Sequence, residues 1–228
     1  GCPMGRVDEA FLELRSHFRE PIVAEIGGFR PPTEPTASWL GAGCWRHGDE
    51  VPQDEGRAMF PLLQINCEEL PRAVEAFGDA KLVVVYFSAT RMPFRKSHGD
   101  GWLIREYDDL AGLVRCDVRP PSPIKPMPVR WSIGETECPS WEQSWELMDM
   151  TPINECEDAF EEFHELPHHG ATKIGGFPTE VQHIVDHPSD FVFQVGSEPK
   201  ANLNWIDAGV VYFSKKPHED WEFDVQFC

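Results

Sequence analysis

The chain is poor in basic residues. It has 20 Lys and Arg against 39 Asp and Glu, which gives a formal net charge of −19 at pH 7 over 228 residues. Nucleic acids are bound through clustered Lys and Arg side chains, so this balance argues against a nucleic-acid partner. A strongly acidic surface favours solubility, or attraction to a basic protein.

Long apolar runs and paired cysteine motifs are also missing. No stretch approaches the ~18 apolar residues of a membrane-spanning helix, and charged residues occur throughout the first twenty positions, so we expect no membrane association and no secretory signal. The seven cysteines form no Cys-x-x-Cys pair. This odd number is typical of mostly free thiols in a reducing compartment. We therefore predict a cytoplasmic protein.

Cofactor and hydrolase signatures are absent as well. There is no Walker loop and no Gly-x-Ser-x-Gly elbow, and Arg46 stands where a dinucleotide-binding loop that began at Gly41 would need its third glycine. We therefore expect no cofactor. A nucleophilic cysteine, such as Cys44 beside His47 or Cys156 near the later histidines, would need a geometry that sequence proximity does not supply.

Three short motifs occur twice and in the same order. Ile-Gly-Gly-Phe is followed by an apolar-Gln-apolar triplet and then by Val-Tyr-Phe-Ser, first at 26–29, 63–65 and 85–88 and again at 174–177, 193–195 and 211–214. This shared order predicts a duplicated structural unit. The paired glycines suit tight strand exits and close backbone packing.

Residue periodicity predicts both helices and strands. Apolar residues at helical spacing from Val7 to Phe18 predict a helix of about fourteen residues that closes before Pro21, and a second helix is expected from about 154 to 165. Apolar, β-branched and aromatic runs predict strands, with short connections that favour antiparallel pairing. The expected strands span 22–26, 60–65, 81–88, 102–107, 113–118, 189–196, 209–214 and 221–227.

These elements predict an α+β fold. We expect two duplicated, mainly antiparallel sheet units packed together, with an N-terminal helix and a second helix before the C-terminal unit. The five prolines between 120 and 128 predict a stiff connector at the boundary between the repeats. The expected segments, packed as one globule, are a helix at 1–21, a first unit at 22–134, an acidic connector with a helix at 135–169, and a second unit at 170–228.

The segment from Glu135 to Glu165 carries eleven carboxylates and no Lys or Arg. A solvated connecting face is the simpler interpretation, and a docking surface for a basic protein is the alternative. The same segment holds His164, Glu165 and His168 in an H-E-x-x-H pattern. Pro167 should end the helix and keep the two imidazoles off one helix face, so we expect no metal site, with His164 and His168 as a distant alternative.

Two glutamines and one loop are the candidate ligand-binding residues. Gln64 and Gln194 occupy matched positions in apolar strands, where a buried amide either ties the sheet to a neighbouring loop or lines a cleft. Trp205 and Asp207 could form a ligand rim. A turn in which Asp207 caps its own backbone and Gly209 takes a positive φ explains the same residues structurally.

With these segments in view, the chain resembles the bacterial YwqG-like family of domains of unknown function. The resemblance covers roughly residues 20–228 and is carried by 173–178, 193–195, Trp205-x-Asp207-x-Gly209 and 211–213, and in the first half by 26–28, 62–66, 69–71 and 86–87. It implies a bacterial, soluble, mixed α and β protein with no established activity and no agreed catalytic residues. Relatives of this kind are suspected of serving as immunity factors for secreted toxins.

We therefore expect a non-enzymatic, cytoplasmic protein-interaction protein, with an immunity-like role toward a basic toxin as its most specific form. The alternative is a small-molecule-binding protein or hydrolase with a cleft between the two repeats.

Overall fold

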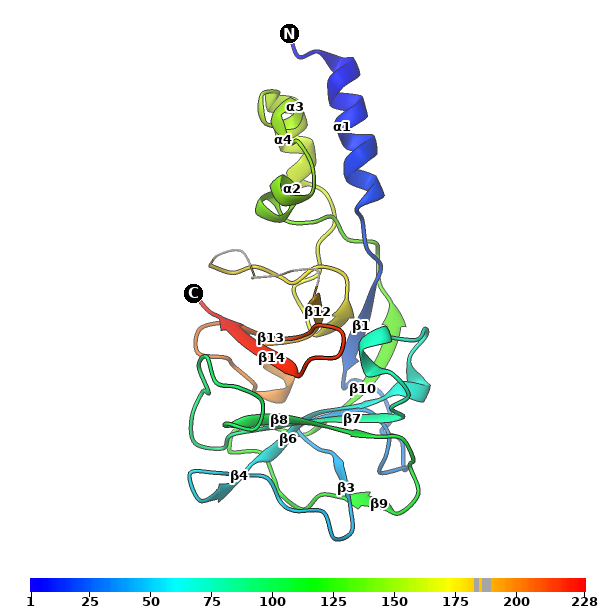
Figure 1. Cartoon of the computed structure of the whole chain (residues 1–228), viewed down its shortest axis with the longest axis vertical. Coiled ribbons are helices and arrows are strands. Elements are labelled where there is room, and N and C mark those ends of the chain that lie inside the picture. The colour runs from blue at the N-terminus through cyan, green and yellow to red at the C-terminus, as the bar shows by residue number, and fades with distance from the viewer. Residues whose placement is uncertain (183–184, 186–189) are drawn as a thin grey trace.

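Ten strands form one large, mainly antiparallel sheet (Figure 1). The computed structural model describes residues 1–182, 185 and 190–228. The strands of this sheet are β1 (Pro21–Ile26), β2 (Trp39–Leu40), β6 (Phe60–Asn66), β7 (Leu82–Phe87), β8 (Trp102–Tyr107), β10 (Met127–Ile133), β11 (Lys173–Gly175), β12 (Phe191–Gly196), β13 (Val210–Lys215) and β14 (Trp221–Gln226). Their order is β14-β13-β12-β11-β1-β10-β2-β6-β7-β8.

Several smaller elements accompany the large sheet. Two short ribbons pair β3 (Cys44–Arg46) with β9 (Leu113–Arg115) and β4 (Gln53–Asp54) with β5 (Arg57–Ala58). Single 3₁₀ turns span Cys67–Glu69, Glu75–Phe77 and Pro199–Ala201.

The sheet curls until its two edge strands meet through side chains. Trp102 of β8 lies 5.5 Å from the ring of Phe223 on β14, and 5.8 Å from that of Phe213 on the neighbouring strand. His98, in the loop before β8, lies 3.3 Å from Asp220 at the start of β14. Aromatic packing therefore joins two edges that share no backbone ladder, and the sheet is nearly closed around the main core.

Four α-helices in the described chain lie beyond one end of the sheet and project away from it (Figure 1). They are α1 (Met4–Ser16), α2 (Trp141–Leu147), α3 (Thr151–Asn154) and α4 (Glu157–His164). We call α1 and residues 138–166 the helical extension. It has its own core, in which Phe11 and Leu14 pack with Ile153 and Phe163, separate from the core of the sheet.

The ends of α2 and α4 follow from local sequence. The Ser140 hydroxyl accepts a hydrogen bond from the backbone N–H of Gln143, and the side-chain oxygen of Gln143 accepts one from the backbone N–H of Ser140, so a capping box starts α2. Helix α4 ends at His164, which confirms the expectation that it would stop before Pro167. No helix in the described residues is long and apolar enough to cross a bilayer.

A disulfide crosslinks the two segments of the helical extension. Cys2, just before α1, is bonded to Cys156, just before α4, while the other five cysteines are free. The expectation of mostly free thiols therefore misses one bridge, because the two cysteines are 154 residues apart and only the packing of α1 on α3 and α4 brings them together.

The mixed, mainly antiparallel class is confirmed, but the strands do not divide into two sheets. Strand β1 pairs with β10 on one side and with β11 on the other, which joins the two halves of the chain into one ladder. The predicted proline connector runs directly into β10, a central strand. Pro128 is tolerated near its start, where its carbonyl accepts from the N–H of Gly27. Of the expected strand at 189–196, Ser189 lies outside the described residues.

Replacing Cys2 by Ser should loosen the helical extension and leave the sheet intact. Releasing a covalent link across so long a loop is expected to lower the stability of the extension by roughly 2–4 kcal/mol. Hydrogen exchange at the amides of α1 and α4 should accelerate, while exchange in β6 and β7 stays unchanged. Cys228→Ser, at an exposed free cysteine, is the matched control. Equal exchange in the two variants would show that packing alone holds α1.

Candidate functional site

A buried carboxylate stands where the helical extension meets the sheet. Glu137 lies between β10 and α2, and only 1% of its side chain is exposed. Its Oε2 lies 2.7 Å from Nζ of Lys173 on β11 and its Oε1 lies 3.0 Å from the same atom. The backbone N–H groups of Phe177 and His169 donate to it at 2.9 Å each. Both carboxylate oxygens are therefore fully engaged.

Lys173 is equally enclosed. Its side chain is 2% exposed, and its ammonium group also donates to the carbonyl of His169 at 2.6 Å. Burial lowers the pKa of Lys173, and the neighbouring Glu137 carboxylate opposes that shift. With three acceptor oxygens around Nζ the ammonium is satisfied. The pair is thus a structural tie rather than a free base or nucleophile.

The second glycine pair leaves the space that the Glu137 carboxylate occupies. Gly175 and Gly176 have φ of 71° and 68°, in the left-handed region that glycine adopts without strain. A Cβ on Gly176 would lie 2.9 Å from Cδ of Glu137 and closer still to Oε1. The turn therefore needs glycine both for its backbone angle and for the space that Glu137 fills.

A pocket of about 380 Å³ opens beside this tie, between α2, α4 and the turn after β11. Ser140 donates a hydrogen bond to Glu180, and burial raises the pKa of the Glu180 carboxyl group while the Ser140 hydroxyl opposes the shift. The charges of Glu142 and Glu146 raise it further. Negative charge is thus concentrated where α2 begins.

The outer face of the extension combines exposed carboxylates with exposed apolar side chains. Trp145, Leu147 and Phe160 are 42%, 38% and 39% exposed. Ten of the eleven carboxylates of this segment are exposed, Glu137 being the exception. We call this the acidic aromatic face. It consists of Trp141, Trp145, Leu147 and Phe160 with Glu135, Glu142, Glu146, Asp149, Glu155, Glu157, Asp158, Glu161, Glu162 and Glu165.

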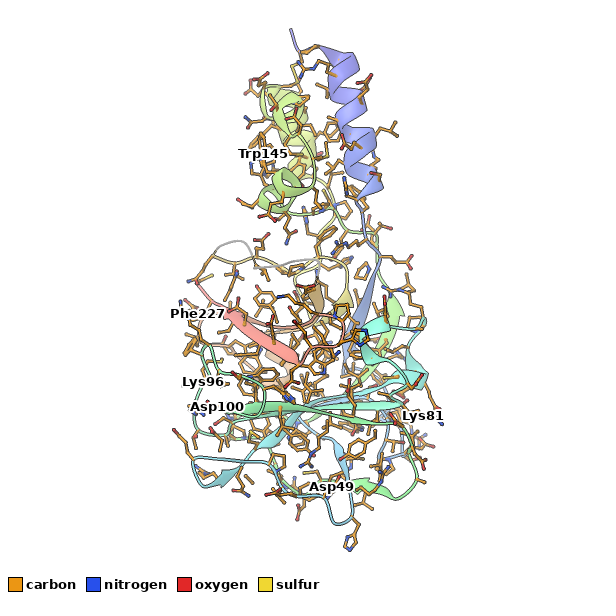
Figure 2. All side chains as sticks on the ribbon, in the orientation of Figure 1. Asp49, Lys81, Lys96, Asp100, Trp145 and Phe227 are labelled. Atoms are coloured by element: carbon orange, nitrogen blue, oxygen red, sulfur yellow. A yellow bond between two sulfur atoms is a disulfide. The ribbon has the colours of Figure 1, made fainter. Side chains whose placement is uncertain are left out.

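The aromatic residues of this face form one cluster. The ring of Trp141 lies 6.0 Å from Trp145 and 4.9 Å from Phe160, both in edge-to-face arrangements, and Phe163 anchors Trp141 from below at 5.1 Å. Figure 2 shows Trp145 on the side of the extension that faces away from α1. A rigid base therefore presents an exposed indole ring among carboxylates.

The sequence points to this face only in part. The acidic run is visible in the sequence, but its tryptophans carry no separate signal there. In the sequence, Glu137 cannot be told apart from the ten carboxylates near it that are exposed. The only residue that could have indicated its burial is Lys173, a single positive charge beside an apolar strand.

Gln64 ties the sheet to the loop that follows the first glycine pair, and Gln194 ties it to the segments on both sides of the second pair. Gln64 accepts from the N–H of Cys44 at 2.6 Å and donates to the carbonyls of Pro35 and Ala37. Gln194 accepts from the N–H of Thr179 at 2.9 Å and donates to Ala171 and Thr179. Both amides are used within the protein, which is the structural alternative stated for them above.

The loop around Trp205 and Asp207 differs from the expected turn. Positive φ falls on Ile206 and Ala208, at 55° and 49°, and not on Gly209. Asn204 rather than Asp207 provides the cap, because its amide bonds Ile206 and Ala208. Gly209 is needed for another reason, since a Cβ there would lie 2.6 Å from the carbonyl oxygens of Trp205 and Gln226. Trp205 itself is buried and Asp207 is exposed.

The H-E-x-x-H residues form no metal-binding group, although His164 and His168 both line the pocket beside Glu137. His164 is the last residue of α4, its Nδ1 lies 2.8 Å from the Phe160 carbonyl, and its ring lies against Trp141. Glu165 and His168 follow the helix end. Within residues 1–182, 185 and 190–228, no group of three or more His, Cys, Asp or Glu side chains is placed to hold a metal ion.

The two candidate nucleophilic cysteines are engaged elsewhere. Cys156 is in the disulfide. Cys44 is buried, burial raises the pKa of its thiol, and its Sγ donates to the carbonyl of Pro35. A thiol with a raised pKa and no exposure is a poor nucleophile.

Substituting Gly176 by Ala should destabilise the protein far more than the same change at Gly28. Both glycines have positive φ, so both variants lose about 1 kcal/mol in backbone strain. Only Gly176 faces Glu137, since a Cβ on Gly28 would meet Lys200 Nζ at an ordinary 3.8 Å. Displacing the carboxylate from Lys173 should add roughly 3 kcal/mol. Urea unfolding measures both free energies. Equal losses would show that Glu137 moves aside freely.

The chain matches a protein-family model, and no curated protein matches it. The matched family is described as a domain of unknown function (DUF1963), and the match runs from residue 40 to residue 221. It begins at the end of β2 and ends at the start of β14, so it takes in most of the sheet, helices α2 to α4 and the tie between Glu137 and Lys173. Since the match covers well over half of the sequence, the chain belongs to the DUF1963 family of uncharacterised domains.

Proposed function

We propose that this protein is a non-enzymatic interaction protein that binds a basic protein through the acidic aromatic face. The observation that carries the proposal is the exposed cluster of Trp145, Leu147 and Phe160 among ten exposed carboxylates, with no Lys or Arg between Glu135 and Glu165. The helical extension displays this face away from the sheet (Figure 1).

The acidic aromatic face has the two features that give protein interfaces their affinity and their fast association. Binding energy concentrates in a few large side chains, with Trp among the most frequent, and surrounding polar groups exclude water. Complementary charge accelerates encounter and suppresses wrong partners. A second copy of this chain is a poor occupant, because two faces with ten carboxylates each would repel. A partner with Lys and Arg around an apolar recess fits best.

Three finer statements belong to the same proposal. The chain is a bacterial, YwqG-like protein of the cytoplasm, its basic partner is a toxin that it neutralises, and the halves built around β6 and β12 derive from one duplicated unit. The family resemblance supports the bacterial, YwqG-like identity and the toxin partner, and the five free cysteines favour the cytoplasm, the one bridge between Cys2 and Cys156 notwithstanding. The third is supported by Gln64 and Gln194, which occupy corresponding motifs and each bond the loop that follows a glycine pair.

Replacing Trp145 by Ala should weaken this complex at least tenfold. A photo-crosslinking residue at position 147, next to the tryptophan, would identify the partner in the source cell, and binding of that purified partner would be measured by calorimetry. We expect an equimolar complex with a basic protein. Its affinity should fall as salt rises from 50 to 500 mM, because the charges at the rim of the face are screened.

Phe94→Ala is the matched control, because Phe94 is 46% exposed and lies in the sheet portion rather than in the extension. It should leave affinity unchanged. The absence of a stoichiometric crosslinked protein would contradict the proposal, as would a complex that Trp145→Ala and salt leave intact.

A further inference from the structure

A second site lies in the sheet portion, apart from the acidic aromatic face. A pocket of about 410 Å³ opens where three segments meet: the loop after β7, the stretch 121–124 and the loop 202–206. Its volume falls within the range of about 300–1,000 Å³ that small-molecule pockets occupy. The first two segments belong to the N-terminal half of the sheet and the third to the C-terminal half, so the pocket spans the junction between them.

The walls of this pocket are mainly apolar and partly aromatic. Phe60, Phe87 and Trp205 belong to the main core, and Met92 and Ile124 pack against it. The rings of Phe87 and Trp205 lie 5.2 Å apart and are inclined at 57°. The pocket is therefore an opening onto the aromatic core of the sheet, suited to a flat ring that stacks against these walls.

The single charged residue that lines the pocket within the described chain is paired with carboxylates that lie outside the lining. Arg91 donates to both oxygens of Asp54, at 2.9 and 2.7 Å, and to Asp100 at 2.7 Å. Glu55 lies a further 3.7 Å from Nε of Arg91, so three carboxylates surround the guanidinium and fix its position. An anion would find no free positive charge in the described lining and a cation would find no acidic residue there, so a neutral molecule fits best.

The rim of the pocket is held in a strained conformation. Among the described residues, six non-glycine residues have positive φ, and Asn202, Ile206 and Ala208 are three of these. Ile206 is the notable one, because a β-branched residue is a genuine outlier there. Its side chain is nevertheless 48% exposed and lines the pocket.

The surrounding contacts maintain that strain. Asn204 bonds the carbonyl of Ile206 at 2.9 Å and the N–H of Ala208 at 3.1 Å, and the N–H of Trp205 donates to Ser197 at 3.0 Å. Strain that is retained in this way concentrates at ligand clamps. Here the strained backbone keeps the Ile206 side chain at the mouth of the pocket. Because this side chain is half exposed there, its position adds little to the stability of the fold.

One donor in the wall is unpaired. Nε1 of Trp205 is buried and has no hydrogen-bond acceptor in the part of the chain that the structure describes. An unpaired buried N–H costs about 1–3 kcal/mol. A ligand that carries an acceptor and enters beside the indole could pair with this donor after a small rotation of the ring.

From these observations we infer that the pocket binds a neutral, flat, mainly apolar ring molecule that carries a hydrogen-bond acceptor, with Trp205 as its wall and Ile206 as its clamp. The site is independent of partner binding at the helical extension.

Quinoline at pH 7.5 is the probe, because it is neutral, bicyclic and accepts one hydrogen bond. Indole, which donates instead, is the comparison compound. In a titration of the ¹⁵N-labelled chain, the indole N–H signal of Trp205, assigned with Trp205→Phe, should shift saturably together with the amides of Ala89 and Ile206. Quinoline should bind at least threefold more tightly than indole.

Ala89→Leu should weaken quinoline binding at least tenfold, because Ala89 lines the pocket and the larger side chain fills it. Ala111→Leu, at an exposed alanine outside the pocket, is the matched control and should change nothing. Ile206→Gly is the second variant. It should melt at or above the wild-type temperature, because glycine tolerates positive φ, and still weaken quinoline binding.

The inference is overturned by the absence of a saturable shift at Trp205, or by binding that Ala89→Leu and Ile206→Gly both leave unchanged. Equal affinity for indole and quinoline would overturn the assigned acceptor.

Discussion

The ion pair between Glu137 and Lys173 is the interaction on which the architecture depends. It is buried at both ends, so each charge would be strongly unfavourable without the other. Lys173 belongs to β11, which pairs with β1 and with β12. Glu137 belongs to the segment that leads into α2. One contact therefore fixes the base of the helical extension against the strand that joins the two halves of the sheet.

Two of the four hydrophobic clusters in the described chain have different roles in this arrangement. The larger one lies within the curled sheet, where aromatic side chains from β8, β13 and β14 close the seam between its edges. The smaller one lies among the helices, and its buried side chains stabilise the helices against one another rather than against the sheet. The exposed Trp145 and Phe160 on that support lie outside this cluster.

The strands were largely predictable from the sequence, since 60–65, 102–107 and 221–227 show the β-branched and aromatic runs of buried strands. Strand β10 was missed because Pro126 and Pro128 mark a connector locally, whereas pairing with β1 makes it central. Helix α2 was missed although Ser140 and Gln143 form a capping box. The tie at Glu137 could not be predicted at all, since its burial depends on residues 36 and 40 positions away in the chain. For Gln64 and Gln194, the sequence posed two alternatives, and the structure shows both amides bonded to neighbouring loops.

The helical extension is built from two segments of the chain, α1 and residues 138–166. In the sequence, the first half of the sheet separates these segments. Helix α1 is synthesised before the residues that cover Phe11 and Leu14, which lie between 138 and 163. A helix of 13 residues is marginal alone in water. During synthesis α1 must therefore remain without its packing partners until nearly all of the first sheet half has been made. The core of the extension can therefore form only after the first half of the sheet has been made, and nascent chains arrested before residue 138 would display the apolar stripe of α1 to chaperones.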